Sequence, residues 1–237
     1  DELTKALKID QPGASAQITG DNYKAIFDGI GYEKISESQR QDAFDKALSY
    51  LELMDSSSNI LLVQDDESDL ADFFKDEPEL RALFKNYLPI YQKLLANHSS
   101  VKTVTVSSDS SLSNNLNSSD LSSYDGVIWF TGNGLGFFSE EGTTLTPKDT
   151  DLLKTYLAGG GKLLLTGQNA LSGQEKSPLV KDYLHLNVFT DMGPGLNVEG
   201  LSGGIYENSK YDVDRFDTPF YFADFVISND KTRTKIN

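Results

Sequence analysis

The sequence contains no cysteine and only two histidines among its 237 residues. The absence of cysteine excludes disulfide bonds, thiolate metal sites and a cysteine nucleophile. The absence of thiols fits a secreted protein that avoids stray oxidation, but a cytosolic protein can also lack cysteine by chance. The chain begins at Asp1 without a methionine or a signal-peptide pattern, and we therefore expect a mature protein or an excised fragment.

Basic residues are also scarce, since 21 lysines and arginines face 36 acidic residues and give a net charge of −15. Such a surface repels phosphate backbones and anionic bilayers, so we expect no nucleic-acid partner. No apolar run approaches the roughly 20 residues of a membrane helix, and we expect no membrane insertion. A hydrophobic content of 38% predicts a folded globular protein.

Three nearly continuous apolar runs stand out at residues 59–66 (NILLVQDD), 124–132 (YDGVIWFTG) and 162–167 (KLLLTG). Runs of this kind are typical of parallel strands that are buried on both faces. They alternate with helical patterns, which predicts an α/β fold with a doubly wound parallel sheet.

Local signals place the helices between these strands. Ser38, with Gln41 as its capping-box partner, is expected to cap the first long helix. Pro89 should kink or split the helical pattern of residues 77–98. Thr146 and Pro147 indicate the N-cap and first residue of a further helix, which the glycines at 159–161 should end.

Three segments in this order, ILLVQDD, YDGVIWFTGNG and YLAGGGKLLLTGQNAL, carry a family resemblance. They resemble the glutamine-amidotransferase-like (flavodoxin-like) accessory domains of secreted bacterial subtilisin-family peptidases. The resemblance covers roughly residues 59–205 and implies a class I glutamine-amidotransferase-like fold there. Residues 206–237 are then an aromatic-rich, irregular and β-rich C-terminal extension.

Residues 1–58 form an N-terminal extension with a strand and a helix, and its segment IFDGIGYEKI…ALSYLEL has a second resemblance. It is similar to the strand and helix that normally close a domain of this family, although here it comes first. Two interpretations follow. The segment is the tail of a preceding domain, or it completes the sheet from the other end of the chain.

The family's active members place a cysteine nucleophile on the turn that here begins at Thr166, and this chain has no cysteine. A hydroxyl of Thr166 or Ser172 would need a base, and the resemblance implies His185 as the position to consider. The sequence also lacks the motifs of a subtilisin triad. We therefore expect amidotransferase activity to be absent.

The carboxyl ends of the strands are the default ligand site of an open α/β sheet. We expect this crevice to be lined by a set of polar residues, namely Asp65, Asp66, Thr131, Asn133, Gln168 and Asn169, with His185 as a further candidate. They could bind a peptide or a sugar, or hold a cation. Alternatively, the aspartates cap the following turn and the amides satisfy loop backbone groups, which is the interpretation we favour.

No cofactor is expected, with calcium as the one alternative, because its ligands would be carboxylate and carbonyl oxygens. Asp212, Asp214 and Asp217 form the acidic cluster that would hold it. A second cluster runs from Asp65 to Asp69. Neither has the spacing of an EF-hand loop.

The resemblance, together with the missing nucleophile, implies a non-catalytic accessory or interaction domain of an extracellular (secreted) or cell-surface bacterial protein that carries a subtilisin-like peptidase. Its partners would be neighbouring domains of that protein, with a peptide or carbohydrate as a further ligand. Two alternatives remain open: a hydrolase that uses a hydroxyl or a metal-bound water at the crevice, and a carbohydrate-binding module.

Overall fold

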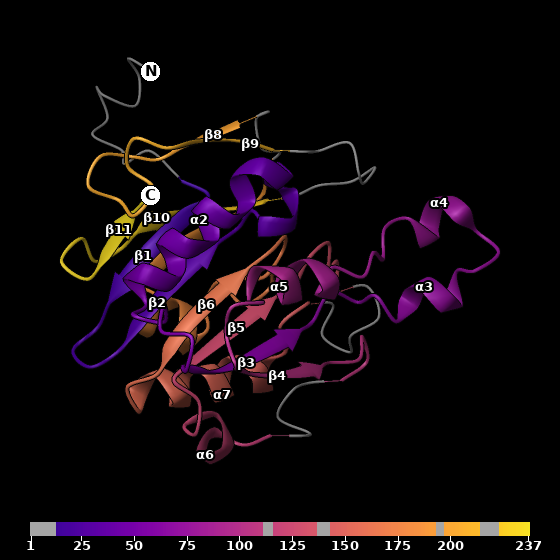
Figure 1. The fold of residues 1–237 in the computed structure, drawn as a ribbon. Helices are drawn as coiled ribbons and strands as arrows, with labels where there is room; N and C mark the ends of the chain where they lie inside the picture. The colour runs from indigo at the N-terminus through magenta and orange to yellow at the C-terminus, as the bar shows by residue number, and fades with distance from the viewer. Residues whose placement is uncertain (1–12, 111–115, 137–142, 193–196, 214–222) are drawn as a thin grey trace.

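A computed structural model describes residues 13–110, 116–136, 143–192, 197–213 and 223–237 of the chain. Figure 1 shows an α/β protein whose central sheet carries helices on both faces. The sheet has seven strands, in the spatial order β11 (Thr234–Ile236), β1 (Ser15–Thr19), β2 (Lys24–Asp28), β6 (Lys162–Thr166), β5 (Gly126–Phe130), β3 (Asn59–Gln64) and β4 (Ser100–Thr105).

Five neighbouring strands, from β2 to β4 in this order, pair in parallel, while β1 is antiparallel to both β2 and β11. The three apolar runs of the sequence are β3, β5 and β6. Strand β2 pairs with β6 from Lys24↔Lys162 to Asp28↔Thr166, so this N-terminal strand lies in the same sheet as residues 59–166.

The parallel strands bury both faces, as their continuous apolar sequences require. Leu61 and Val63 of β3 face one core, whereas Ile60 and Leu62 face the other. The first core is covered by α6 (Ser118–Leu121), α7 (Pro147–Ala158) and the π-helical turn η3 (Leu179–Tyr183). The second is covered by η1 (Tyr32–Lys34), α2 (Glu37–Tyr50) and α5 (Leu88–Leu94).

Of the three helix boundaries predicted from local sequence signals, two are confirmed and one is wrong. Thr146 is the N-cap of α7 and forms a capping box with Asp149, and Gly159 caps the other end. Pro89 lies in the first turn of α5, which is separate from α3 (Leu70–Phe73) and α4 (Pro78–Arg81). The predicted cap at Ser38 is wrong because α2 begins two residues earlier, after Ser36.

The C-terminal part of the chain adds short antiparallel pairs. Strand β7 (Leu186–Met192) pairs with β10 (Ala223–Ser228), and β8 (Asn197–Glu199) pairs with β9 (Lys210–Asp212). The chain then returns to the central sheet through β11. Within the described ranges, no helix has the length and apolar character to cross a membrane.

Candidate functional site

The expected crevice lies where β3 and β5 end side by side, and its first acid is fully enclosed. Asp65 directly follows β3 and is 4% exposed. Its Oδ2 accepts a hydrogen bond of 2.9 Å from the indole Nε1 of Trp129. Burial raises the pKa of Asp65 well above its ordinary value, and the nearby carboxylate of Asp149 raises it further.

The next two acids bind the chain's own backbone. Asp66 accepts hydrogen bonds from the backbone N–H groups of Ser68 and Tyr87, at 3.2 and 3.0 Å. Glu67, in the left-handed region at φ 53°, accepts from the N–H groups of Leu135 and Gly136, at 2.9 and 2.7 Å. Burial raises the pKa of both carboxyl groups, against the lowering effect of these hydrogen bonds.

The polar residues after β5 and β6 come together around the same loop. Thr131 donates to the backbone carbonyl of Gln168 at 3.0 Å, and the Gln168 amide donates to the carbonyl of Asn133 at 3.0 Å. Asn169, at φ 52°, contacts the carbonyl of Gly134 at 3.5 Å. These side chains thus hold two strand-end loops together.

Two tyrosines and a buried lysine form hydrogen bonds next to the loop that follows β5. Asn133 donates to the hydroxyl of Tyr87 at 2.7 Å. The ammonium of Lys34, which is 0% exposed, donates to the same hydroxyl at 3.0 Å. Tyr91 donates to Glu33 Oε2 at 2.7 Å. Most polar groups at the β3–β5 crevice are therefore engaged with one another, although among the described residues the buried Oδ1 of Asn133 has no hydrogen-bond partner.

His185 lies away from this crevice. Its neighbour Tyr183 accepts a hydrogen bond through its carbonyl from the hydroxyl of Tyr23, which directly precedes β2. This is the amino end of the parallel strands, whereas Gln168 follows their carboxyl end. Burial lowers the pKa of His185, and the charged groups that act on it are Asp230, Arg233 and Asp182.

The acidic clusters give no metal site in the part of the chain that the structure describes, where no group of three or more acidic or histidine side chains is arranged around one point. Asp212 is exposed on β9. Asp214 and Asp217 lie outside the described residues, so calcium at this cluster stays a prediction.

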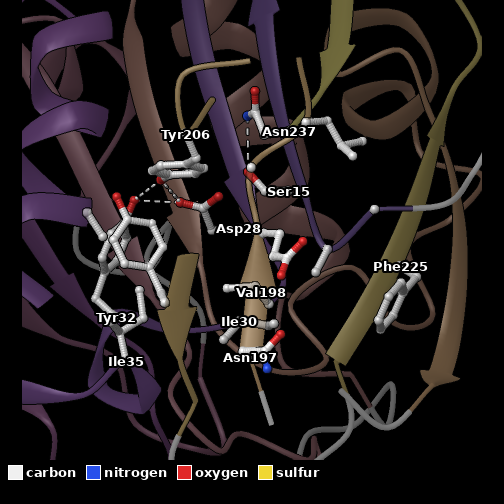
Figure 2. Close-up of a pocket in the computed structure, with 17 residues that line it drawn as sticks. Ser15, Asp28, Ile30, Tyr32, Ile35, Asn197, Val198, Tyr206, Phe225 and Asn237 are labelled. Carbon is white, nitrogen blue, oxygen red and sulfur yellow. Dashed lines mark hydrogen bonds between the residues drawn. The ribbon is translucent and has the colours of Figure 1, made fainter. Parts of the chain in front are cut away.

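A cavity of about 250 Å³ lies instead at the carboxyl end of β2, and we call it the Asp28 cavity. It forms where β1, η1, the β8–β9 pair and β10 meet, and Figure 2 shows the residues around it. Its lining is mainly apolar and aromatic and consists of Gly13, Ala14, Ser15, Asp28, Ile30, Tyr32, Ile35, Ala43, Asn197, Val198, Glu199, Gly200, Leu201, Tyr206, Tyr211, Phe225 and Asn237.

Asp28 is the buried acid of this cavity, with 5% exposure. Its Oδ2 accepts hydrogen bonds from the hydroxyls of Tyr32 and Tyr206, at 2.5 and 2.9 Å, and the two hydroxyls lie 2.6 Å apart. Figure 2 shows the carboxyl group between these hydroxyls on one side and Ser15 on the other. Among the described residues, its buried Oδ1 has no hydrogen-bond partner.

Burial also controls the protonation of Asp28. It raises the pKa of this carboxyl group, while the hydroxyls of Ser15, Tyr32 and Tyr206 act in the opposite direction. A buried carboxyl oxygen without a partner is costly unless something pairs with it. The arrangement is therefore suited to receive a hydrogen-bond donor from outside the chain.

The sequence-based site did not include Asp28, Tyr32 or Tyr206. One signal was present, because Asp28 ends an apolar strand in the same way as Asp65 and Asp66 follow β3. The tyrosine partner could not be found in that way, since Tyr206 comes from the loop between β8 and β9, 178 residues further along the chain.

Comparisons with known proteins identify no relative. No family model, curated protein or solved structure matches this chain.

Proposed function

We propose that this chain is a non-catalytic binding domain that takes a small organic molecule into the Asp28 cavity. The observation that carries the proposal is the buried Asp28 carboxyl group, held by two tyrosine hydroxyls on the wall of a mainly apolar cavity of about 250 Å³. Small-molecule sites are typically apolar hollows of this kind with a few fixed polar groups.

The strand order supports the flavodoxin-like form of the fold. If β3, β4, β5 and β6 are counted as strands one to four and β2 as strand five, the parallel sheet has the order 2-1-3-4-5. This is the flavodoxin-like order of doubly wound sheets. The fifth position is filled by a strand that precedes the other four in the chain, in line with the resemblance of the segment IFDGIGYEKI…ALSYLEL to a closing element.

The placement of the polar groups favours binding over hydrolysis. A hydroxyl nucleophile at Thr166 or Ser172 needs a base within hydrogen-bond reach. His185 belongs to the opposite end of the parallel strands, and the crevice acids accept hydrogen bonds from backbone and tryptophan N–H groups. A secreted accessory domain of a subtilisin-like peptidase, as the resemblance implies, is the setting that we propose for such a module.

The carbohydrate-binding alternative is less well supported. Sugar sites use an exposed aromatic face as a platform. At the Asp28 cavity, Tyr32, Tyr206 and Tyr211 are all buried, with at most 8% exposure.

A fragment screen by NMR tests the proposal. Amide signals of residues around the Asp28 cavity, such as Ser15 and Val198, are expected to shift with small amphipathic molecules. Val198→Phe should fill the cavity and abolish these shifts, whereas Val101→Phe on β4, at the far edge of the sheet, should retain them. Shifts that map to other regions, or that survive Val198→Phe, would contradict the proposed site.

A further inference from the structure

We infer that the Asp28 cavity selects a small organic cation, with a primary ammonium group on an apolar body of about the size of a phenylethyl group. This inference rests on the proposed function and adds the chemical class of the ligand. It is drawn from the charge, the wall and the size of the cavity.

The charged residues that line the Asp28 cavity are all acidic among the described residues. Asp28 and Glu199 are the acidic residues among the described residues around the cavity, and that lining contains no lysine, arginine or histidine. Lys210 extends from the rim to Glu199 at 2.6 Å and is exposed. The whole chain carries a net charge of −15, which raises the local concentration of cations near its surface.

The free oxygen of Asp28 gives an ammonium group its anchor. The two tyrosine hydroxyls already donate to Oδ2, so a second donor would pair with Oδ1. An ammonium group has three N–H donors and no acceptor, and a hydrogen bond between two charged groups is about twice as strong as a neutral one. A carboxylate ligand would instead place a second negative charge next to the Asp28 carboxylate, and the two charges would repel each other.

The wall of the Asp28 cavity suits the apolar part of such a molecule. Aromatic side chains of Tyr32, Tyr206, Tyr211 and Phe225 border the cavity together with aliphatic residues. Aromatic rings attract cations that lie against their faces. An apolar cavity of about 150 Å³ holds benzene, so about 250 Å³ has room for one ring with a two-carbon chain and an amine.

Calorimetric titration with three matched probes tests the inference: 2-phenylethylammonium, 2-phenylethanol and 3-phenylpropionate. We expect the ammonium probe to bind at least tenfold more tightly than the alcohol, and the carboxylate not to bind. Asp28→Asn should remove the tenfold preference and leave the alcohol within threefold. Glu199→Gln changes the net charge equally at the exposed rim and should alter binding less than threefold.

The outcomes separate the two proposals. Equal affinity for ammonium and alcohol would overturn the cation class and leave the binding function standing. No binding of any probe would overturn the proposed function. Equal losses in Asp28→Asn and Glu199→Gln would overturn the role of Asp28, because a general charge effect would then explain the preference.

A measurement on the unmodified chain covers the case in which Asp28→Asn fails to fold. The ionised form of Asp28 is the form that pairs with a cation, so the affinity for 2-phenylethylammonium should fall as the pH is lowered and the carboxyl group takes up a proton. Tyr32 and Tyr206, which face Asp28, stay neutral because burial raises their pKa well above the ordinary value. Glu199 is at the exposed rim, and Ser15 does not titrate. An affinity for 2-phenylethylammonium that stays unchanged as the pH is lowered would contradict the pairing.

Discussion

Replacement of Asp65 by asparagine should stabilise this protein at neutral and alkaline pH. The side chain is enclosed next to Trp129, and both burial and Asp149 raise its pKa well above the ordinary value. Asparagine keeps an oxygen that can accept the hydrogen bond from the Trp129 indole, and it carries no charge. The variant thus resembles the protonated form of Asp65.

The sign of the pH dependence follows from this raised pKa. Below the ordinary aspartate pKa the side chain is protonated in both the folded and the unfolded chain, so variant and wild type should differ little. As the pH rises toward the raised pKa, the unfolded chain releases its proton first and the wild type loses stability relative to the variant. Above the raised pKa the difference is constant.

The expected gain at pH 8 is about 1 to 3 kcal/mol, the usual cost of a buried polar group that is poorly compensated. For a chain of this size, each kcal/mol moves the melting temperature by roughly 2–4 °C. Urea unfolding at pH 3 and pH 8 measures both differences, with Asp76→Asn as an exposed control of equal charge change. An Asp65→Asn variant that is less stable than wild type at pH 8 would refute the reasoning.

Three further variants test other parts of the structure by urea unfolding. Tyr32→Phe removes one hydroxyl donor from Asp28 and should cost about 1 kcal/mol, whereas an unchanged midpoint would show that this bond adds nothing. Ile26→Ala, in the fully buried middle of β2, should cost about 2–5 kcal/mol, and a cost below 1 kcal/mol would argue against β2 as part of the core. Thr146→Ala removes the capping side chain of α7 and should cost about 0.5–2 kcal/mol, while Ser36→Ala should cost less because its side chain makes no capping bond.

The parts of the fold that depend on neighbouring residues were predictable from the sequence. The apolar runs at 59–66, 124–132 and 162–167 form central strands because strands buried on both faces need apolar residues at consecutive positions. The start of α7 was predictable because Thr146, Pro147 and Asp149 together form a capping pattern. Ser38 and Gln41 imitate the same pattern, but the helix already includes Ser38.

The candidate site could be predicted only in part, because its pieces are far apart in the chain. The polar residues at the ends of β3, β5 and β6 do meet, as the common edge of parallel strands requires. The acids after β3 accept hydrogen bonds from the backbone N–H groups of Leu135, Gly136 and Tyr87. These donors lie in loops whose paths the sequence pattern does not define. The Asp28 cavity depends on the same long-range placement.

The position of the cavity follows from the unusual place of β2. In the β3–β5 region most polar groups of the usual ligand crevice form hydrogen bonds within the chain itself. The parallel sheet ends at β2, where the antiparallel strand β1 and the β8–β9 pair leave a space above the last residue, Asp28. A binding module with this arrangement would use the edge of the parallel sheet rather than its centre.

A crystal structure of the protein with 2-phenylethylammonium tests this account most directly. We predict that the molecule occupies the Asp28 cavity, with its nitrogen within hydrogen-bond distance of Asp28 Oδ1 and its ring among Tyr32, Tyr211 and Phe225. A molecule bound at the β3–β5 crevice, or a cavity that stays empty at saturating concentration, would contradict the central claim.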